Sequence, residues 1–74
     1  MTEFEKNCYG MSEEDMKARY GGYVRSVGTE MFVAGLLSDC QAMLEKPVNG
    51  DQERVRKTLN MAKFFLFENM KEVA

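Results

Sequence analysis

The sequence predicts an all-α fold, a helical hairpin of a long or kinked helix over residues 12–45 and a second helix over residues 51–72. Two observations carry this prediction. Apolar residues recur at steps of three and four through both segments, which is the spacing of one face of a helix. Between the segments stand the only proline, Pro47, and the pair Asn49-Gly50, which are typical of a turn. No stretch alternates apolar and polar residues as a half-buried strand does. We therefore expect one domain over residues 1–74, with a tail at 1–11 and a turn at 46–50.

The tail over residues 1–11 carries Phe4, Tyr9 and Met11. Apolar side chains at this spacing bury surface when they dock on a neighbouring element. We expect part of the tail to do so, with Gly10 letting the backbone turn before the next element.

The first long helix has a clear start at Ser12-Glu13-Glu14-Asp15. Ser12 can accept a hydrogen bond from a first-turn amide, and Asp15 stands at the position of the acid in a capping box. The three acids also suit the positive end of the helix dipole. Helix initiation explains them without a metal site.

Glycines leave the continuity of residues 12–45 open. Gly21, Gly22 and Gly28 each cost about 1 kcal/mol relative to alanine inside a helix, so a break near Gly21-Gly22 or near Gly28 is one interpretation. The other is continuous, because Gly21, Gly28, Gly35 and Ala42 recur every seven residues and share one face of a single helix. Such a continuous helix would be about 50 Å long, whereas the second helix would be about 33 Å long. This difference favours a partner that packs against the excess length.

The second helix is predicted to begin at Asn49 or Asp51, both good N-cap residues. Its apolar positions Val55, Leu59 and Leu66 continue at steps of three and four, and no glycine or proline follows Gly50. The prediction for this segment is a helix over about residues 51–72.

The most informative stretch of this helix is Met61 to Phe67, where large apolar residues cover more than one face. A two-helix hairpin buries one stripe of each helix, so some of these rings are expected to face water and to mark an interaction surface. The alternative is that the tail folds back and covers them through Phe4 and Tyr9. The candidate interface residues are Phe64, Phe65, Phe67, Met61 and the small residues Gly21, Gly28 and Gly35.

A hairpin of this size buries too little surface to be very stable alone, so we expect a homodimer with a four-helix bundle arrangement. The chain holds seven methionines. They are interpreted as gap-filling core residues, with an adaptable docking groove as the alternative.

Composition argues against an enzyme. The chain has no histidine, so the commonest general base and metal ligand is absent from the sequence. The glycines match no phosphate-binding loop. Cys8 and Cys40 are expected to be free thiols. Cys40 is expected to be buried, and the neighbouring Asp39 is expected to raise the pKa of the Cys40 thiol. We expect no catalytic residue, no cofactor and no metal.

Charge points away from nucleic acid and membranes. The formal net charge is -2, and the longest uncharged apolar run, residues 31–37, is too short to span a bilayer. The polar opening of the chain shows no secretory signal, so a cytoplasmic location is expected. Basic residues of the second helix are interleaved with acids, and pairs such as Glu53 and Lys57 indicate a solvated face; nucleic-acid binding is therefore not favoured.

In style, the first third of the chain resembles small uncharacterised helical proteins of tailed phages and their marine relatives. The resemblance lies in Met11-Ser12-Glu13-Glu14-Asp15 before a helix, followed by Tyr23-Val24-Arg25-Ser26-Val27. It brings no specific motif and no active site. It implies a protein that binds and modifies a host protein, or a small accessory of the virion.

The function expected from the sequence is a non-enzymatic protein-interaction module, a homodimeric adaptor or an inhibitor of another protein. Two alternatives stay open: a small DNA-associated regulator, and a structural or assembly accessory protein.

Overall fold

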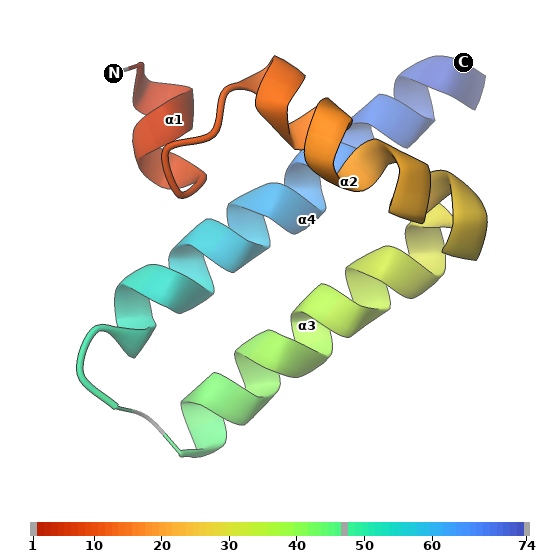
Figure 1. The fold of residues 1–74 in the computed structure, drawn as a ribbon. Coiled ribbons are helices and arrows are strands. Elements are labelled where there is room, and N and C mark those ends of the chain that lie inside the picture. The colour runs from red at the N-terminus through yellow and green to blue at the C-terminus, as the bar shows by residue number, and fades with distance from the viewer. Residues whose placement is uncertain (1, 47, 74) are drawn as a thin grey trace.

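The computed structural model describes residues 2–46 and 48–73, and within these ranges the chain is helical and contains no strand. The described residues form four helices: α1 (Glu3–Asn7), α2 (Glu13–Val27), α3 (Thr29–Glu45) and α4 (Asp51–Val73) (Figure 1). The all-α prediction is confirmed.

The first two helices begin with capping boxes. Before α2, the Ser12 hydroxyl accepts from the Asp15 amide at 3.1 Å, and the Asp15 carboxylate accepts from the Ser12 amide at 3.3 Å, as the sequence predicts. Thr2 and Glu5 form the same reciprocal pair before α1. This second box gives a helical start to a segment that the sequence predicted only as a tail.

The single long helix considered over residues 12–45 is not formed, because the helix is interrupted at Gly28. This residue has φ +91° and ψ 146°, closes α2 through its amide to Val24, and begins α3 through its carbonyl to Phe32. Side chains disfavour that conformation, whereas glycine adopts it readily. Gly21 and Gly22 lie inside α2 and do not interrupt it. Gly21 and Gly35 therefore belong to different helices, and the predicted continuous small-residue face does not exist.

Substitution of Gly28 by valine is expected to destabilise the fold by roughly 1–3 kcal/mol, because a β-branched residue is strained at this φ. Gly22→Ala is the matched control. Gly22 is exposed and lies within α2, and a methyl group there would meet no atom within 4 Å apart from its chain neighbours and the backbone of its own helix. Alanine at this site should stabilise the helix by about 0.5–1 kcal/mol. Urea unfolding followed by circular dichroism measures both, and shifts of the same sign would contradict the assignment of the break.

α4 begins at Asp51, as predicted. Asp51 is buried, and its carboxylate accepts a hydrogen bond of 2.7 Å from the Val48 amide, which ties the turn to the helix start. The predicted turn also contains Pro47, which lies outside the described residues.

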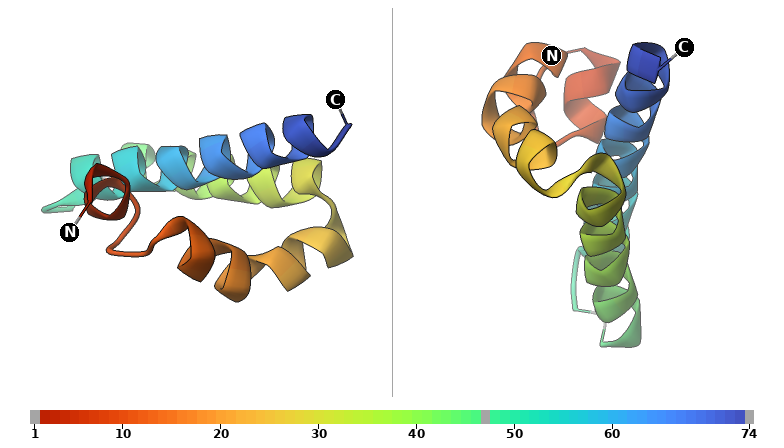
Figure 2. Two further views of the ribbon diagram at one scale, coloured as in Figure 1. Left: turned by 90° about the horizontal axis from the view of Figure 1, so that it is seen from above. Right: turned by 90° about the vertical axis from the view of Figure 1, so that its right-hand side faces the viewer.

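The helices form two layers. α3 and α4 run antiparallel side by side, and α1 and α2 lie together against one side of this pair (Figure 2). The sharp turn at Gly28 makes this arrangement possible, because α2 folds back across α3 and α4 instead of extending α3. The opposite side of the α3–α4 pair has no covering helix among the described residues.

The core lies between the two layers. Met16 of α2 and Cys8 after α1 are almost completely buried. Both belong to a cluster with Phe32, Phe64 and Phe65, and Phe4, Tyr20 and Leu36 pack against it at its edge. α2, α3 and α4 contribute residues to this cluster, and α1 packs against it through Phe4.

Candidate interaction surfaces

Three of the residues predicted as an exposed interface are core residues. Phe64, Phe65 and Met61 are each 8% exposed or less. Phe65 makes edge-to-face contacts with Phe32 and Phe64, both at 5.1 Å between ring centroids, and with Tyr20 at 6.5 Å. Of the rings in this stretch, some of which were expected to face water, Phe64 and Phe65 are buried because α1 and α2 cover α4 on the sides where they project, whereas Phe67 is exposed.

The alternative, that the tail covers the rings, describes Phe64. The Phe4 ring of α1 meets the Phe64 ring edge-on at 5.4 Å. α1 is held further along α4, where Asn60 Nδ2 donates to the Asn7 carbonyl at 3.2 Å and Arg56 contacts the Asn7 side chain. Phe67 remains 54% exposed, beside a shallow hollow that it shares with Phe4 and Phe64.

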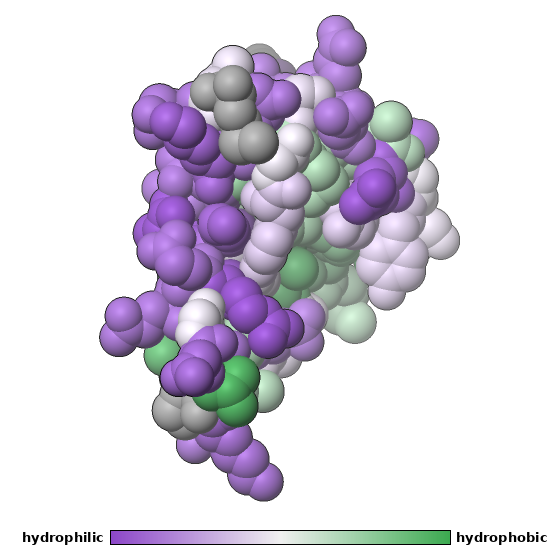
Figure 3. All heavy atoms as spheres, turned by 60° about the vertical axis from the view of Figure 1, so that its left-hand side comes forward, coloured by the Kyte–Doolittle hydropathy of each residue, from purple (hydrophilic) through white to green (hydrophobic). Residues whose placement is uncertain are grey.

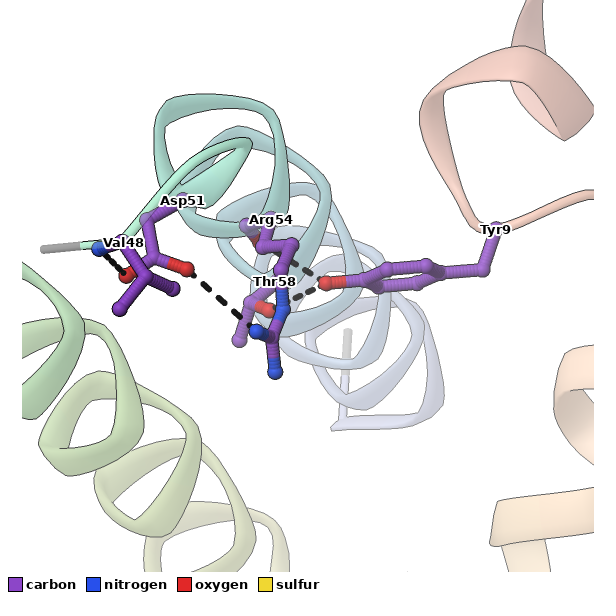
Figure 4. A network of polar contacts seen from close by, with 5 residues as sticks. All are labelled: Tyr9, Val48, Asp51, Arg54 and Thr58. Atoms are coloured by element: carbon purple, nitrogen blue, oxygen red, sulfur yellow. Dashed lines mark hydrogen bonds and ion pairs between the residues drawn. The ribbon is translucent and has the colours of Figure 1, made fainter.

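Tyr9 anchors the chain between α1 and α2 to α4. Its hydroxyl donates to the Arg54 carbonyl at 2.9 Å and lies 2.9 Å from the Thr58 hydroxyl (Figure 4). Lys57 Nζ lies 5.5 Å from the centroid of the Tyr9 ring. Tyr9 has φ +57°, and the following Gly10 also has positive φ. A non-glycine residue in this region is uncommon. The contacts with α4 offset the cost of this conformation.

Tyr9→Phe keeps the ring and removes the hydroxyl. It is expected to destabilise the fold by about 1 kcal/mol, the usual contribution of one intramolecular hydrogen bond. Urea unfolding measures the change. Tyr23→Phe is the control, because Tyr23 is 61% exposed and its hydroxyl has no hydrogen bond to the described residues. Equal effects of the two variants would contradict the anchoring role of Tyr9.

Tyr9 also borders a hollow of about 550 Å³ between α2, α3 and α4. In Figure 3 apolar side chains gather at the centre of this face, with polar side chains around them. The apolar lining includes Met11, Met43 and Met61, and Arg19, Asp39 and Arg54 stand among the polar lining. Three methionines thus line one open hollow, so core filling and an adaptable docking groove both stay open as interpretations of the methionines.

An uncovered apolar surface lies on the other side of the α3–α4 pair. Successive residues of α3 are turned by 100° around the helix axis. Phe32 faces Tyr20 of α2, and Cys40 faces Val55 of α4. Further around the helix in the same direction, past α4, lie Leu44 and Leu37. Around α4, Phe65 faces the core, Val55 faces Cys40, and the next positions are again apolar. We call this surface the outer face and define it by Leu37, Leu44, Leu59, Leu66 and Met70.

By their helical spacing, the sequence placed the outer-face residues on the apolar stripes that a hairpin is expected to bury. The structure instead leaves them 38–64% exposed. The apolar stripes of α3 and α4 are wider than one contact can bury, and α1 and α2 occupy only one side. The width of these stripes was the signal in the sequence, whereas the side that stays uncovered depends on where Gly28 sends α2.

Gly21, Gly28 and Gly35 do not gather on the outer face as one surface. Gly21 is buried on α2 beside the Arg25 guanidinium, and a methyl group there would lie 3.4 Å from Arg25. Gly28 forms the corner between α2 and α3, and Gly35 is exposed on α3.

The thiols are free and buried. Burial raises the pKa of the Cys8 thiol, and burial together with the negative charge of Asp39 raises the pKa of Cys40. Both effects oppose thiolate formation, and the role predicted for Asp39 is confirmed. Over the described residues, no group of three cysteine and carboxylate side chains is placed to hold a metal ion.

Basic residues of α4 pair with acids one turn away. Arg56 binds Glu53 at 2.6 Å, and Lys71 binds Glu68 at 3.2 Å. Glu68 also binds Lys17 of α2 at 3.2 Å, and hydrogen bonds from Lys17 and Lys71 lower its pKa. The sequence predicted Glu53 to pair with Lys57. Arg56 takes that place, and Lys57 lies over the Tyr9 ring instead.

No helix in the described part of the chain combines the length and the apolar character needed to cross a membrane. Comparisons with protein-family models, with curated proteins and with solved structures find no match to this chain.

Proposed function

We propose that this protein is a non-enzymatic helical interaction module that forms a homodimer through the outer face. One observation carries the proposal: five large apolar side chains lie on one side of two adjacent helices and are 38–64% exposed. Isolated exposed apolar residues are ordinary, whereas a continuous row on two adjacent helices marks a surface that binds protein.

A second copy suits this surface. Two antiparallel helices that present an apolar stripe are half of a four-helix bundle, and packing against the same stripe of another chain completes it. The gain is large for a chain of 74 residues, because a small domain buries a small share of its surface alone. The hollow beside Tyr9 stays open in such a dimer, so an adaptor or inhibitor retains a free surface for another protein.

The test is the absolute mass in solution, measured by light scattering over a concentration series at low and high salt. We expect a dimer at micromolar concentration whose formation depends weakly on salt, because burial of apolar surface drives it. A monomer over the whole series would overturn the homodimer. In the same measurement, particles that grow without limit would support an assembly protein. In a separate binding assay, nucleic-acid binding that weakens steeply with salt would support the DNA-associated regulator.

A further inference from the structure

The outer face carries two charged residues without an ion pair among the described residues, one on each helix. Lys63 of α4 lies between Leu59, Leu66 and Met70 by helical spacing. Glu30 of α3 lies on the stripe of Leu37 and Leu44, seven residues before Leu37. Both are exposed, and each would be surrounded by apolar surface if a partner covered the face without offering an opposite charge.

The contacts between α3 and α4 fix the relative heights of these residues. Cys40 Sγ lies 3.8 Å from the Val55 carbonyl oxygen, and the Phe32 and Phe65 rings lie 5.1 Å apart. Continuing this antiparallel register places Glu30 level with Leu66, three residues and therefore about 4.5 Å along the axis from Lys63. A second copy must bring its own Glu30 to this height if Glu30 is to meet Lys63.

The twofold axis of a dimer that packs outer face against outer face lies in the plane between the copies, and two directions of this axis keep the helices of both copies aligned. If the axis runs along the helices, α3 of each copy lies over α4 of the other at the same height. Glu30 of one copy then comes within side-chain reach of Lys63 of the other, twice per dimer. If the axis runs across the helices, each helix lies over its own equivalent in reverse, and Glu30 stands near the far end of α3 of the second copy.

We propose that the partner of the outer face is a second copy of this chain oriented with α3 over α4, and that Lys63 of each copy pairs with Glu30 of the other. This inference rests on the proposed homodimer and adds its orientation. Charge complementarity selects this orientation, because Glu30 of one copy meets Lys63 of the other. Among the described residues, Glu30 is the only acid that continues the Leu37–Leu44 stripe of the outer face, and Lys63 lies at the centre of the α4 stripe. In the arrangement with the axis across the helices, Glu30 and Lys63 do not meet.

Charge reversal tests the pairing. Lys63→Glu and Glu30→Lys each place like charges opposite one another, so each variant alone should dimerise more weakly, by roughly tenfold in Kd at low salt and less at high salt. When the two variants are mixed in equal amounts, each mixed dimer holds one natural pair and one reversed pair. Association should recover to within about twofold of the natural chain in the mixture. Recovery on mixing distinguishes a contact between chains from a contact within one chain.

Arg25→Glu is the control for Lys63→Glu, because it makes the same change of charge on α2 in the other layer. Sedimentation velocity at several concentrations measures all five samples, the natural chain included, and circular dichroism checks that each variant is helical. A natural chain that is monomeric overturns both this pairing and the homodimer. A dimer that neither variant weakens, or whose weakened variants fail to recover when mixed, overturns the pairing and leaves the homodimer standing.

Discussion

Replacement of Phe65 by alanine is expected to lower the free energy of unfolding by about 3–5 kcal/mol, the range for removing a buried phenylalanine. Phe65 is 5% exposed, and its ring contacts rings from α2, α3 and α4. These three helices meet at this side chain. A chain of 74 residues has roughly 4–11 kcal/mol of stability in total, so the variant should lose a large share of it.

Phe67→Ala is the matched control for this experiment. It makes the same chemical change on the same helix, two residues further on, at a ring that is 54% exposed. We expect a loss within about 1 kcal/mol, because most of that ring already contacts water. Urea unfolding at one fixed protein concentration measures both variants and keeps any contribution from dimerisation comparable. Equal losses would contradict the position of Phe65 at the junction of the layers.

The limits of α4 could be predicted from the sequence because local chemistry determines them. The segment contains no glycine or proline after Gly50, its apolar residues keep helical spacing, and Asp51 is a good residue for a helix start. The capping box of Ser12 and Asp15 was predictable for the same reason, since both partners lie within one turn. Periodicity and caps together locate these elements without any knowledge of distant contacts.

The break at Gly28 was one of the interpretations that the sequence left open. Gly21 and Gly22 are equally poor helix formers, yet α2 passes through both. Packing decides between the glycines. A turn at Gly28 lets Met16 and Tyr20 reach the aromatic rings of α4, whereas a continuous helix would hold both side chains away from α4. Local propensity contains no information about this long-range gain.

The fate of the aromatic stretch could not be predicted for a related reason. Phe64 and Phe65 are adjacent and point about 100° apart, so two different neighbours must cover them. α1 supplies Phe4 for one, and α2 and α3 supply Tyr20 and Phe32 for the other. α1 has five residues, too few to be stable as an isolated helix, and its place is set by docking on α4. The uncovered surface is therefore the one that α1 and α2 do not reach.

Replacement of Leu66 by glutamate is expected to abolish dimerisation at micromolar concentration, raising the Kd at least a hundredfold. Leu66 lies on the α4 stripe of the outer face and is 39% exposed. In a dimer through this face, the variant buries a charge twice, once from each copy. Burial of an unpaired carboxylate costs several kcal/mol, and each 1.4 kcal/mol corresponds to tenfold in Kd.

Leu37→Glu tests the same surface from the other helix, at a side chain that is 49% exposed, and the same loss of dimer is expected. Met31→Glu is the matched control. Met31 is 69% exposed on α3, but it lies about 120° around the helix from Leu37 and off the outer face. Its glutamate should leave the dimer intact while changing the net charge by the same amount. Light scattering gives the mass of each variant, and helical circular dichroism shows that each is folded. Monomers from Leu66→Glu and Leu37→Glu beside a dimeric Met31→Glu would place the interface on the outer face, whereas three dimers would place it elsewhere on the molecule.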